Sequence, residues 1–200
     1  DVQRTMRIFD SWLGNGTGDG ILVPYAEFDT TWQPFNRVFI VIYEPTREAI
    51  VERILGDLAD ETVANERALE IARAEARTNP QNGFAWFNIG SSLTRLGRYD
   101  EAQYAFDQAR RFNLPFRMLW YQFYPFEAYF NVGRYTDVLS LVNSGLNNGG
   151  EYIEETHYWQ GRVLAEQGER EQARASFQRA LRHNPRFAPA QAALDALGGS

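Results

Sequence analysis

The sequence predicts an all-α fold in which about three helical hairpins stack, with flanking helices and a small β-containing segment at the N-terminus. Two observations predict it: apolar residues recur at helical spacing through most of the chain, and three similar glycine-centred segments follow one another at a near-constant distance. With 44% apolar residues, 200 residues are enough to bury a substantial core. We divide the chain into residues 1–45, with the β-segment; residues 46–80, with connecting and leading helices; and residues 81–200, with the repeats and a capping helix.

Composition excludes several kinds of function. The chain has no cysteine, and all 20 basic residues are arginine, which removes thiolate chemistry, disulfides, Schiff bases and the phosphate-loop lysine. A net charge of -6 argues against a nucleic-acid-binding surface, which needs a concentrated positive field. The longest apolar run, Val38 to Tyr43, is too short to cross a bilayer, so we expect no membrane insertion by this chain. Because the sequence starts at Asp1 rather than Met, we expect either a recombinantly trimmed chain or a processed product whose targeting signal is missing.

Residues 1–45 predict a strand and a short helix. The β-branched and aromatic run at 37–43 predicts a buried strand, and a helix is expected to start at Pro24. The stretch FDSWLGNGTGDG at 9–20 raises the question of a phosphate or calcium loop. Its glycines lack the spacing of a phosphate-binding loop, and Ala26 stands where a calcium loop needs its bidentate acid. We interpret the stretch as a plain turn.

Residues 46–80 predict two helices. The sequence REAIVERILGDL at 47–58 is short and amphipathic. The sequence ERALEIARAEARTNP at 66–80 has alanines, Leu69 and Ile71 at helical spacing, and predicts the second helix of an incomplete leading repeat.

Three later segments align on a central glycine: LTRLGRYDEAQYAF, YFNVGRYTDVLSLV and LAEQGEREQARASF. In each unit a first helix is expected to end at the glycine, which can adopt the left-handed conformation of a helix exit, and a second helix starts shortly after it. Gly90 and Gly161 permit close helix crossing, while Phe106 and Phe177 are expected on the inner face of the second helices.

This pattern, above all FAWFNIGSSLTRLGRYDEAQYAFDQA, resembles the tetratricopeptide repeat over about residues 82–187. The resemblance implies a right-handed superhelix, and APAQAALDAL at 188–197 is expected to close it as a capping helix. The middle unit departs from the pattern, with Phe126 at the small-residue position, Val138 for the usual alanine and Pro125 inside its first helix. We expect wider helix spacing and a kink there.

The N-terminal residues resemble a second family. Three stretches are similar to the C-terminal end of a family 39 papain-like cysteine peptidase domain, the bacteriocin-processing type: DSWLG at 10–14, PYAEF at 24–28 and WQPFNR at 32–37. In that family the acid at the position of Asp10 orients the catalytic histidine, so the resemblance implies a vestigial role for Asp10. Because the chain has no cysteine and no histidine before His157, we expect no catalysis by it. The resemblance also implies a bacterial protein acting outside the cytoplasm, although no residue specifies a compartment.

Tetratricopeptide arrays bind ligands on a concave face lined by the first helix of each unit. We therefore expect an aromatic-lined groove for a peptide or protein, formed by Phe87, Asn88, Ser91, Trp120, Phe123, Tyr124, Glu127, Tyr158 and Arg162. Only Asn88 and Arg162 come near the lysine and asparagine clamp that holds peptide C-terminal carboxylates, so we predict no receptor of that kind.

The stretch WYQFYPFEAYF at 120–130 is the sharpest candidate, because eight of its eleven residues are aromatic or proline, too many for one buried stripe. Either its rings line a ligand groove or the N-terminal segment packs over them, and we favour the second. His157 and His183 lie far apart in sequence and predict no metal site, and we expect no cofactor.

The sequence therefore predicts a non-catalytic protein-interaction scaffold that binds a protein or peptide and no nucleic acid. Two alternatives stay open. The chain is the C-terminal fragment of a papain-like cysteine peptidase whose repeats present substrate, or it is a repeat domain that self-associates as a homodimer.

Overall fold

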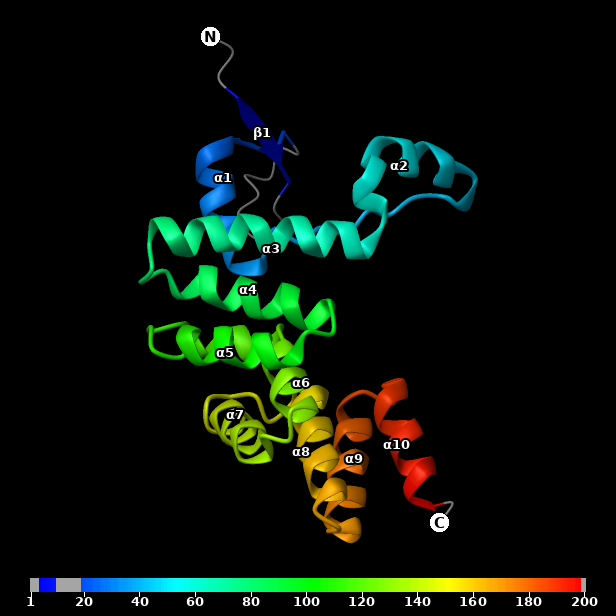
Figure 1. Ribbon diagram of the computed structural model, residues 1–200. Helices are drawn as coiled ribbons and strands as arrows, with labels where there is room; N and C mark the ends of the chain where they lie inside the picture. The colour runs from blue at the N-terminus through cyan, green and yellow to red at the C-terminus, as the bar shows by residue number, and fades with distance from the viewer. Residues whose placement is uncertain (1–3, 10–18, 199–200) are drawn as a thin grey trace.

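The computed structural model describes residues 4–9 and 19–198, and these form a mostly helical array with a small sheet at one end (Figure 1). Strand β1 (Thr5–Ile8) pairs antiparallel with β2 (Ile21–Pro24) in the register Thr5↔Pro24. Helix α1 (Tyr25–Trp32) follows β2 directly and has Pro24 as its N-cap, which confirms the helix expected there. A 3-10 turn, η1 (Gln33–Phe35), ends this segment. The glycine-rich stretch at 10–18, with Asp10, lies outside the described residues.

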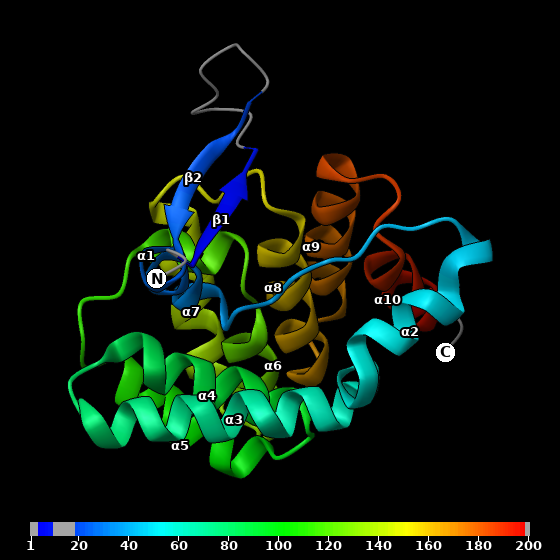
Figure 2. The ribbon, with the colours of Figure 1, turned by 90° about the horizontal axis from the view of Figure 1, so that it is seen from above.

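The buried strand expected at 37–43 is wrong. Residues 38–44 form neither helix nor strand, and the described strands lie earlier, at 5–8 and 21–24. The side chains of this run are exposed, with Ile40 at 84% and Ile42 at 93%. In the view from above, the run crosses from α1 to α2, which lies off to one side of the repeats (Figure 2). The composition of this run favours a strand, but no described strand lies beside it to pair with.

The two helices expected in residues 46–80 are confirmed. Four elements fill this part of the chain: η2 (Pro45–Arg47), α2 (Glu48–Leu55), η3 (Gly56–Ala59) and α3 (Glu61–Thr78). Helix α3 starts earlier than its apolar pattern indicates, because the carboxylate of Asp60 caps it. Asp60 Oδ1 accepts from the N–H groups of Thr62 and Val63 at 2.8 and 3.0 Å.

The repeats form three consecutive hairpins, in the order expected. They are α4 (Gly83–Arg95) with α5 (Tyr99–Ala109), α6 (Tyr124–Asn131) with α7 (Tyr135–Asn147), and α8 (Glu154–Glu166) with α9 (Arg170–His183). The central glycines Gly97, Gly133 and Gly168 have φ of +70°, +75° and +80°, the left-handed region that few other residues enter cheaply. Helix α10 (Ala188–Gly198) packs on α9 and provides the expected cap.

The kink expected at Pro125 is wrong. Residues 116–120 form a 3-10 turn, η4 (Phe116–Trp120), and α6 begins only at Tyr124. Pro125 therefore lies in the first turn of α6, where a helix needs no N–H from it. The first helix of the middle unit is short for this reason, and Trp120 and Phe123 precede it.

The core runs along the hairpins in two clusters. The larger extends from α3 to α8 and contains the aromatic rings of the first two hairpins, including Phe106, Phe126 and Tyr129. The smaller joins α9 to α10 around Phe177 and Ala190. Among the described helices, none has both the length and the apolar content needed to cross a bilayer.

Candidate functional site

The segment Gln33–Arg37, which we call the docked segment, lies against α4 and the end of η4. Two buried side-chain amides donate hydrogen bonds to its backbone. Asn88 Nδ2 donates to the carbonyl oxygen of Gln33 at 2.7 Å, and Gln122 Nε2 donates to that of Pro34 at 2.9 Å. Asn36 Nδ2 donates to Ser92 Oγ at 2.9 Å. The N-terminal segment is therefore attached to the repeats mainly by polar contacts to polypeptide backbone and amides.

Arg37 links the docked segment to two helices. Its Nε and Nη2 donate to the Asp29 carboxylate of α1 at 2.5 and 2.8 Å, and Nη2 also donates to Glu75 Oε1 of α3 at 2.7 Å. The hydrogen bonds from Arg37 hold the pKa of Asp29 below its ordinary value despite some burial, and those to Asp29 raise the pKa of Arg37. Both groups are therefore charged at neutral pH.

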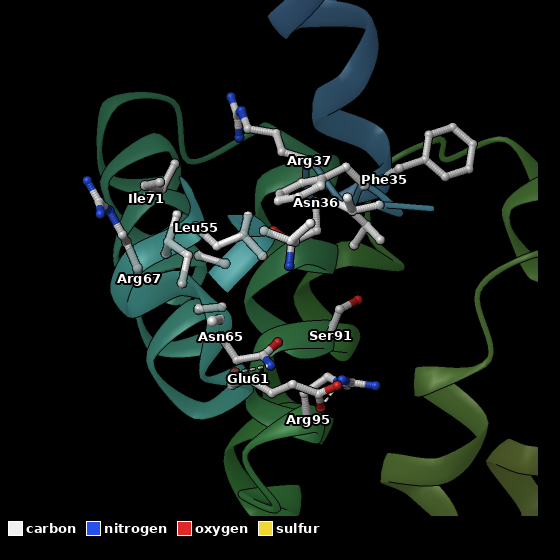
Figure 3. A pocket seen from close by; sticks show the side chains of 18 of the residues that line it. Phe35, Asn36, Arg37, Leu55, Glu61, Asn65, Arg67, Ile71, Ser91 and Arg95 are labelled. Atoms are coloured by element: carbon white, nitrogen blue, oxygen red, sulfur yellow. Dashed lines mark hydrogen bonds and ion pairs between the residues drawn. The ribbon is translucent and has the colours of Figure 1, made fainter. Parts of the chain in front are cut away.

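A cavity of about 770 Å³ opens beside the docked segment, between residues 38–43 and helices α2, α3 and α4 (Figure 3). Leu55 of α2 and Ile71 of α3 belong to its apolar wall, while Ser91 and the ion pair between Arg95 Nη2 and Glu61 Oε2, at 2.6 Å, lie on its polar side. The site is therefore open, apolar along one wall and polar along the other, as is common for ligand sites.

The wall formed by residues 39–43 has a period of two, although Val38 before it lines the cavity as well. Phe39, Val41 and Tyr43 line the cavity, whereas Ile40 and Ile42 do not and expose 84% and 93% of their surface. Alternation of this kind is typical of an extended chain whose successive side chains point to opposite sides.

The expected groove residues have different surroundings in the structure. Asn88 holds the docked segment, and Ser91 and Tyr124 line the cavity. Phe87 lies in the core, with its ring 5.3 Å from that of Phe106. Further along, Trp120 packs edge-on against Phe116, Phe123 packs on Phe126, and Glu127 Oε1 accepts from Tyr99 Oη at 3.2 Å. At the third hairpin Arg162 Nη1 donates to Tyr158 Oη, and its guanidinium lies 4.3 Å from the Phe130 ring centre.

The aromatic stretch 120–130 is buried mostly by neighbouring helices. Phe126, Tyr129 and Phe130 are buried, and the ring of Phe126 stacks on that of Trp159 at 6.3 Å. Tyr121, by contrast, is 67% exposed. The docked segment touches this stretch at Gln122, so it covers only part of what we expected it to cover.

The structure brings together the two histidines that are far apart in sequence. The rings of His157 and His183 stack with centroids 5.3 Å apart and an angle of 17° between their planes. Burial lowers the pKa of His157, although its hydrogen bond to the Glu151 carbonyl opposes the shift. Among residues 4–9 and 19–198, no cluster of three or more histidine, aspartate or glutamate side chains could hold a metal ion.

Three functional candidates were missed from the sequence: Arg37, Glu75 and Gln122. The signal for Gln122 was a single amide within an aromatic run. Arg37 and Glu75 carried no local signal, because an ion pair 38 residues apart in sequence exists only after the N-terminal segment folds back on α3.

Comparisons with known proteins agree with this architecture. The tetratricopeptide repeat family matches residues 83–113 and 154–187, which cover the first and third hairpins and leave the middle hairpin and residues 1–45 unmatched. The fold is similar to the crystal structure of MamA, with a TM-score of 0.58 and 14% identity over 78% of this chain and 84% of that chain. It is also similar to a MamA RS-1 ArsTM double mutant, with a TM-score of 0.57 and 17% identity over 67% of this chain and 74% of that chain. No curated protein matches the sequence. The chain thus carries a mostly helical tetratricopeptide repeat domain with a small N-terminal two-stranded sheet.

Proposed function

We propose that this tetratricopeptide repeat domain is a non-catalytic module that binds a protein partner, and that the partner contacts the cavity beside the docked segment. Tetratricopeptide repeats typically mediate protein–protein interactions, which supports this class of function. A chain without cysteine also has no thiol nucleophile to offer.

The observation that carries the proposal is the state of residues 39–43. Their backbone N–H and C=O groups make no hydrogen bond with any other described residue, and their side chains are apolar and exposed. Unpaired backbone beside exposed apolar side chains is a ready template for another extended chain. The cavity next to it would take the side chains of that chain.

Photo-crosslinking in the cells that express the natural gene tests the proposal. The photoreactive residue p-benzoylphenylalanine replaces Tyr43 at the cavity or, as the matched control, Tyr152, which is 71% exposed at the third hairpin. We expect a heavier cross-linked species from position 43 only, and a several-fold weaker one when Ile71 in the cavity wall is changed to Glu. The same species from both positions, or none from position 43, would contradict the proposal.

The same experiment separates the alternatives. Self-association would give a cross-linked species of twice the mass of the chain. The resemblance of residues 10–37 to a peptidase domain has no part in the proposal. The peptidase alternative would be tested by looking for a longer reading frame with a cysteine and a histidine upstream.

A further inference from the structure

We propose that the docked segment is an internal ligand, and that the surface under it, formed by Glu75, Asn88 and Gln122, binds an arginine-bearing peptide segment of the partner. The inference rests on the proposed protein-binding function. It specifies the chemistry of a surface that adjoins the cavity and that Gln33–Arg37 fills in this state.

The polar groups of this surface recognise polypeptide backbone. Asn88 is fully buried and Gln122 is 7% exposed, and each donates to a main-chain carbonyl, those of Gln33 and Pro34 respectively. Every peptide carries such carbonyls. These two amides therefore select for the course of the peptide backbone and not for particular side chains.

The docked segment leaves one acceptor of Asn88 unpaired. Asn88 Oδ1 is buried and has no hydrogen-bond partner. A partner segment that brings an N–H or O–H donor within reach of Asn88 Oδ1 would satisfy this acceptor, and a buried acceptor gains most from such a donor.

A second buried acceptor is also unpaired. Glu75 Oε2 is buried without a partner, while Oε1 accepts from Arg37 Nη2. Arg37 gives Glu75 this one hydrogen bond and places its Nε–Nη2 edge on Asp29. A partner arginine that faces Glu75 with Nη1 and Nη2 could make two parallel hydrogen bonds to its carboxylate.

The docked segment and the elements that flank it also bury few side chains. None of the residues of α1 or η1 is buried, and residues 38–44 beyond it are exposed. Asn36 and Arg37 both have positive φ, 51° and 54°, a strained conformation for arginine in particular. Helix α4 beneath it, by contrast, has ten buried residues. Segments with few buried contacts open at lower cost than the core, so Gln33–Arg37 can leave while α4 stays folded.

Binding of fluorescent peptides to the full chain tests the inference. The probes are residues 30–39, TTWQPFNRVF, and the same peptide with Arg37→Gln, followed by fluorescence anisotropy. With the chain variant Asn36→Ala, which removes the hydrogen bond to Ser92 and weakens docking, we expect the unchanged peptide to bind at least tenfold more tightly than the Arg37→Gln peptide. Adding Asn88→Leu to that variant should abolish binding, and Asn131→Leu at an exposed asparagine should not. Equal binding of both peptides, or no binding to the Asn36→Ala chain, would overturn the inference.

Hydrogen exchange of the unmodified chain needs no variant. We expect the amides of residues 35–38 to exchange at least tenfold faster than those of α4. Equal protection would make the docked segment a permanent part of the core and would also overturn the inference. If the peptides do not bind but the cross-link from position 43 still forms, this inference alone is overturned. If the cross-link does not form, the proposed function is overturned.

Discussion

The ring of Phe106 lies directly against Gly90, so that a Cβ atom built on Gly90 would come within 2.6 Å of Phe106 Cε1. Gly161 and Phe177 repeat this relationship in the third hairpin, again at 2.6 Å. In the middle hairpin the sizes are exchanged, with Phe126 at the glycine position and the smaller Val142 at the phenylalanine position, both buried. Two hairpins thus carry the ring on the second helix, and the middle one carries it on the first.

Gly90→Ala should lower the free energy of unfolding by about 1–3 kcal/mol, because the added methyl group overpacks the ring of Phe106. This outweighs the roughly 1 kcal/mol that alanine gains over glycine in a helix. Urea denaturation followed by circular dichroism measures it. In a Phe106→Val background, which copies the size exchange of the middle hairpin, the same change should cost less. Strict additivity of the two changes would contradict the direct contact.

The guanidinium of Arg134 joins the first two hairpins. Arg134 Nη1 and Nη2 donate to the Asp107 carboxylate at 2.7 and 3.0 Å, and its Nε donates to Asp137 Oδ2 at 2.9 Å. The Tyr129 hydroxyl donates to Asp107 Oδ1 at 2.9 Å. Burial alone would raise the pKa of Asp107, but the hydrogen bonds from Arg134 and Tyr129 outweigh it and hold that pKa below its ordinary value.

Arg134→Gln should therefore destabilise the fold by about 1 kcal/mol at pH 7, since the partly exposed pair is screened by solvent. A carboxylate with a depressed folded pKa contributes stability above its unfolded pKa of about 3.9 and loses it as pH falls through the folded value. The variant should thus lose less stability than the native chain between pH 5 and pH 2, as measured by urea denaturation. Arg98→Gln, which breaks a more exposed pair with Glu101, is the control and should change both quantities less, because solvent screens that pair more strongly. Parallel pH curves for Arg134→Gln and the native chain would contradict the assignment.

His157 predicts a second pH dependence, in the third hairpin. Burial is the main cause of its lowered pKa, and the positive side chains of Arg179 and Arg182 and the ring of His183, all on α9, add to it. Because the folded state favours the neutral ring, the unfolded state binds more protons below about pH 6.5, and stability falls as pH drops from there to the folded pKa. His157→Gln should flatten the unfolding free energy between pH 7.5 and pH 5. His183→Gln should keep most of the dependence, since the buried ring remains, and an equal loss in both variants would count against burial as the cause.

The sequence predicted the parts of the fold that depend on local pattern. Gly97, Gly133 and Gly168 marked the hairpins, because a left-handed helix exit selects glycine wherever it occurs. The run at 37–43 was misassigned because its composition favours a strand, while a strand also needs a partner that the sequence does not reveal. Pro125 was misplaced because the start of α6 depends on the 3-10 turn before it, which has no sequence signature.

The candidate site was predicted less well than the fold, for a physical reason. Asn88 and Ser91 were found because they occupy the inner face of a recognisable first helix. The groups that complete the site, Arg37, Glu75 and Gln122, come from three segments that meet only in the folded chain. Long-range polar contacts of this kind leave no periodicity in the sequence.

The exposed run at 38–43 gives the last prediction. Changing Ile40 and Ile42 to Lys together should leave the free energy of unfolding within about 0.5 kcal/mol of the native value, because both side chains are almost fully exposed. Urea denaturation checks this, with Ile89→Lys as the control: Ile89 is 6% exposed in the core, and a charge there should be strongly destabilising. The same two lysines should reduce the cross-link from position 43 several-fold, because they place charge along a chain that the partner is proposed to cover. An unchanged cross-link at unchanged stability would mean that the partner does not approach this side of the run. Lost stability would mean instead that the run packs against the fold.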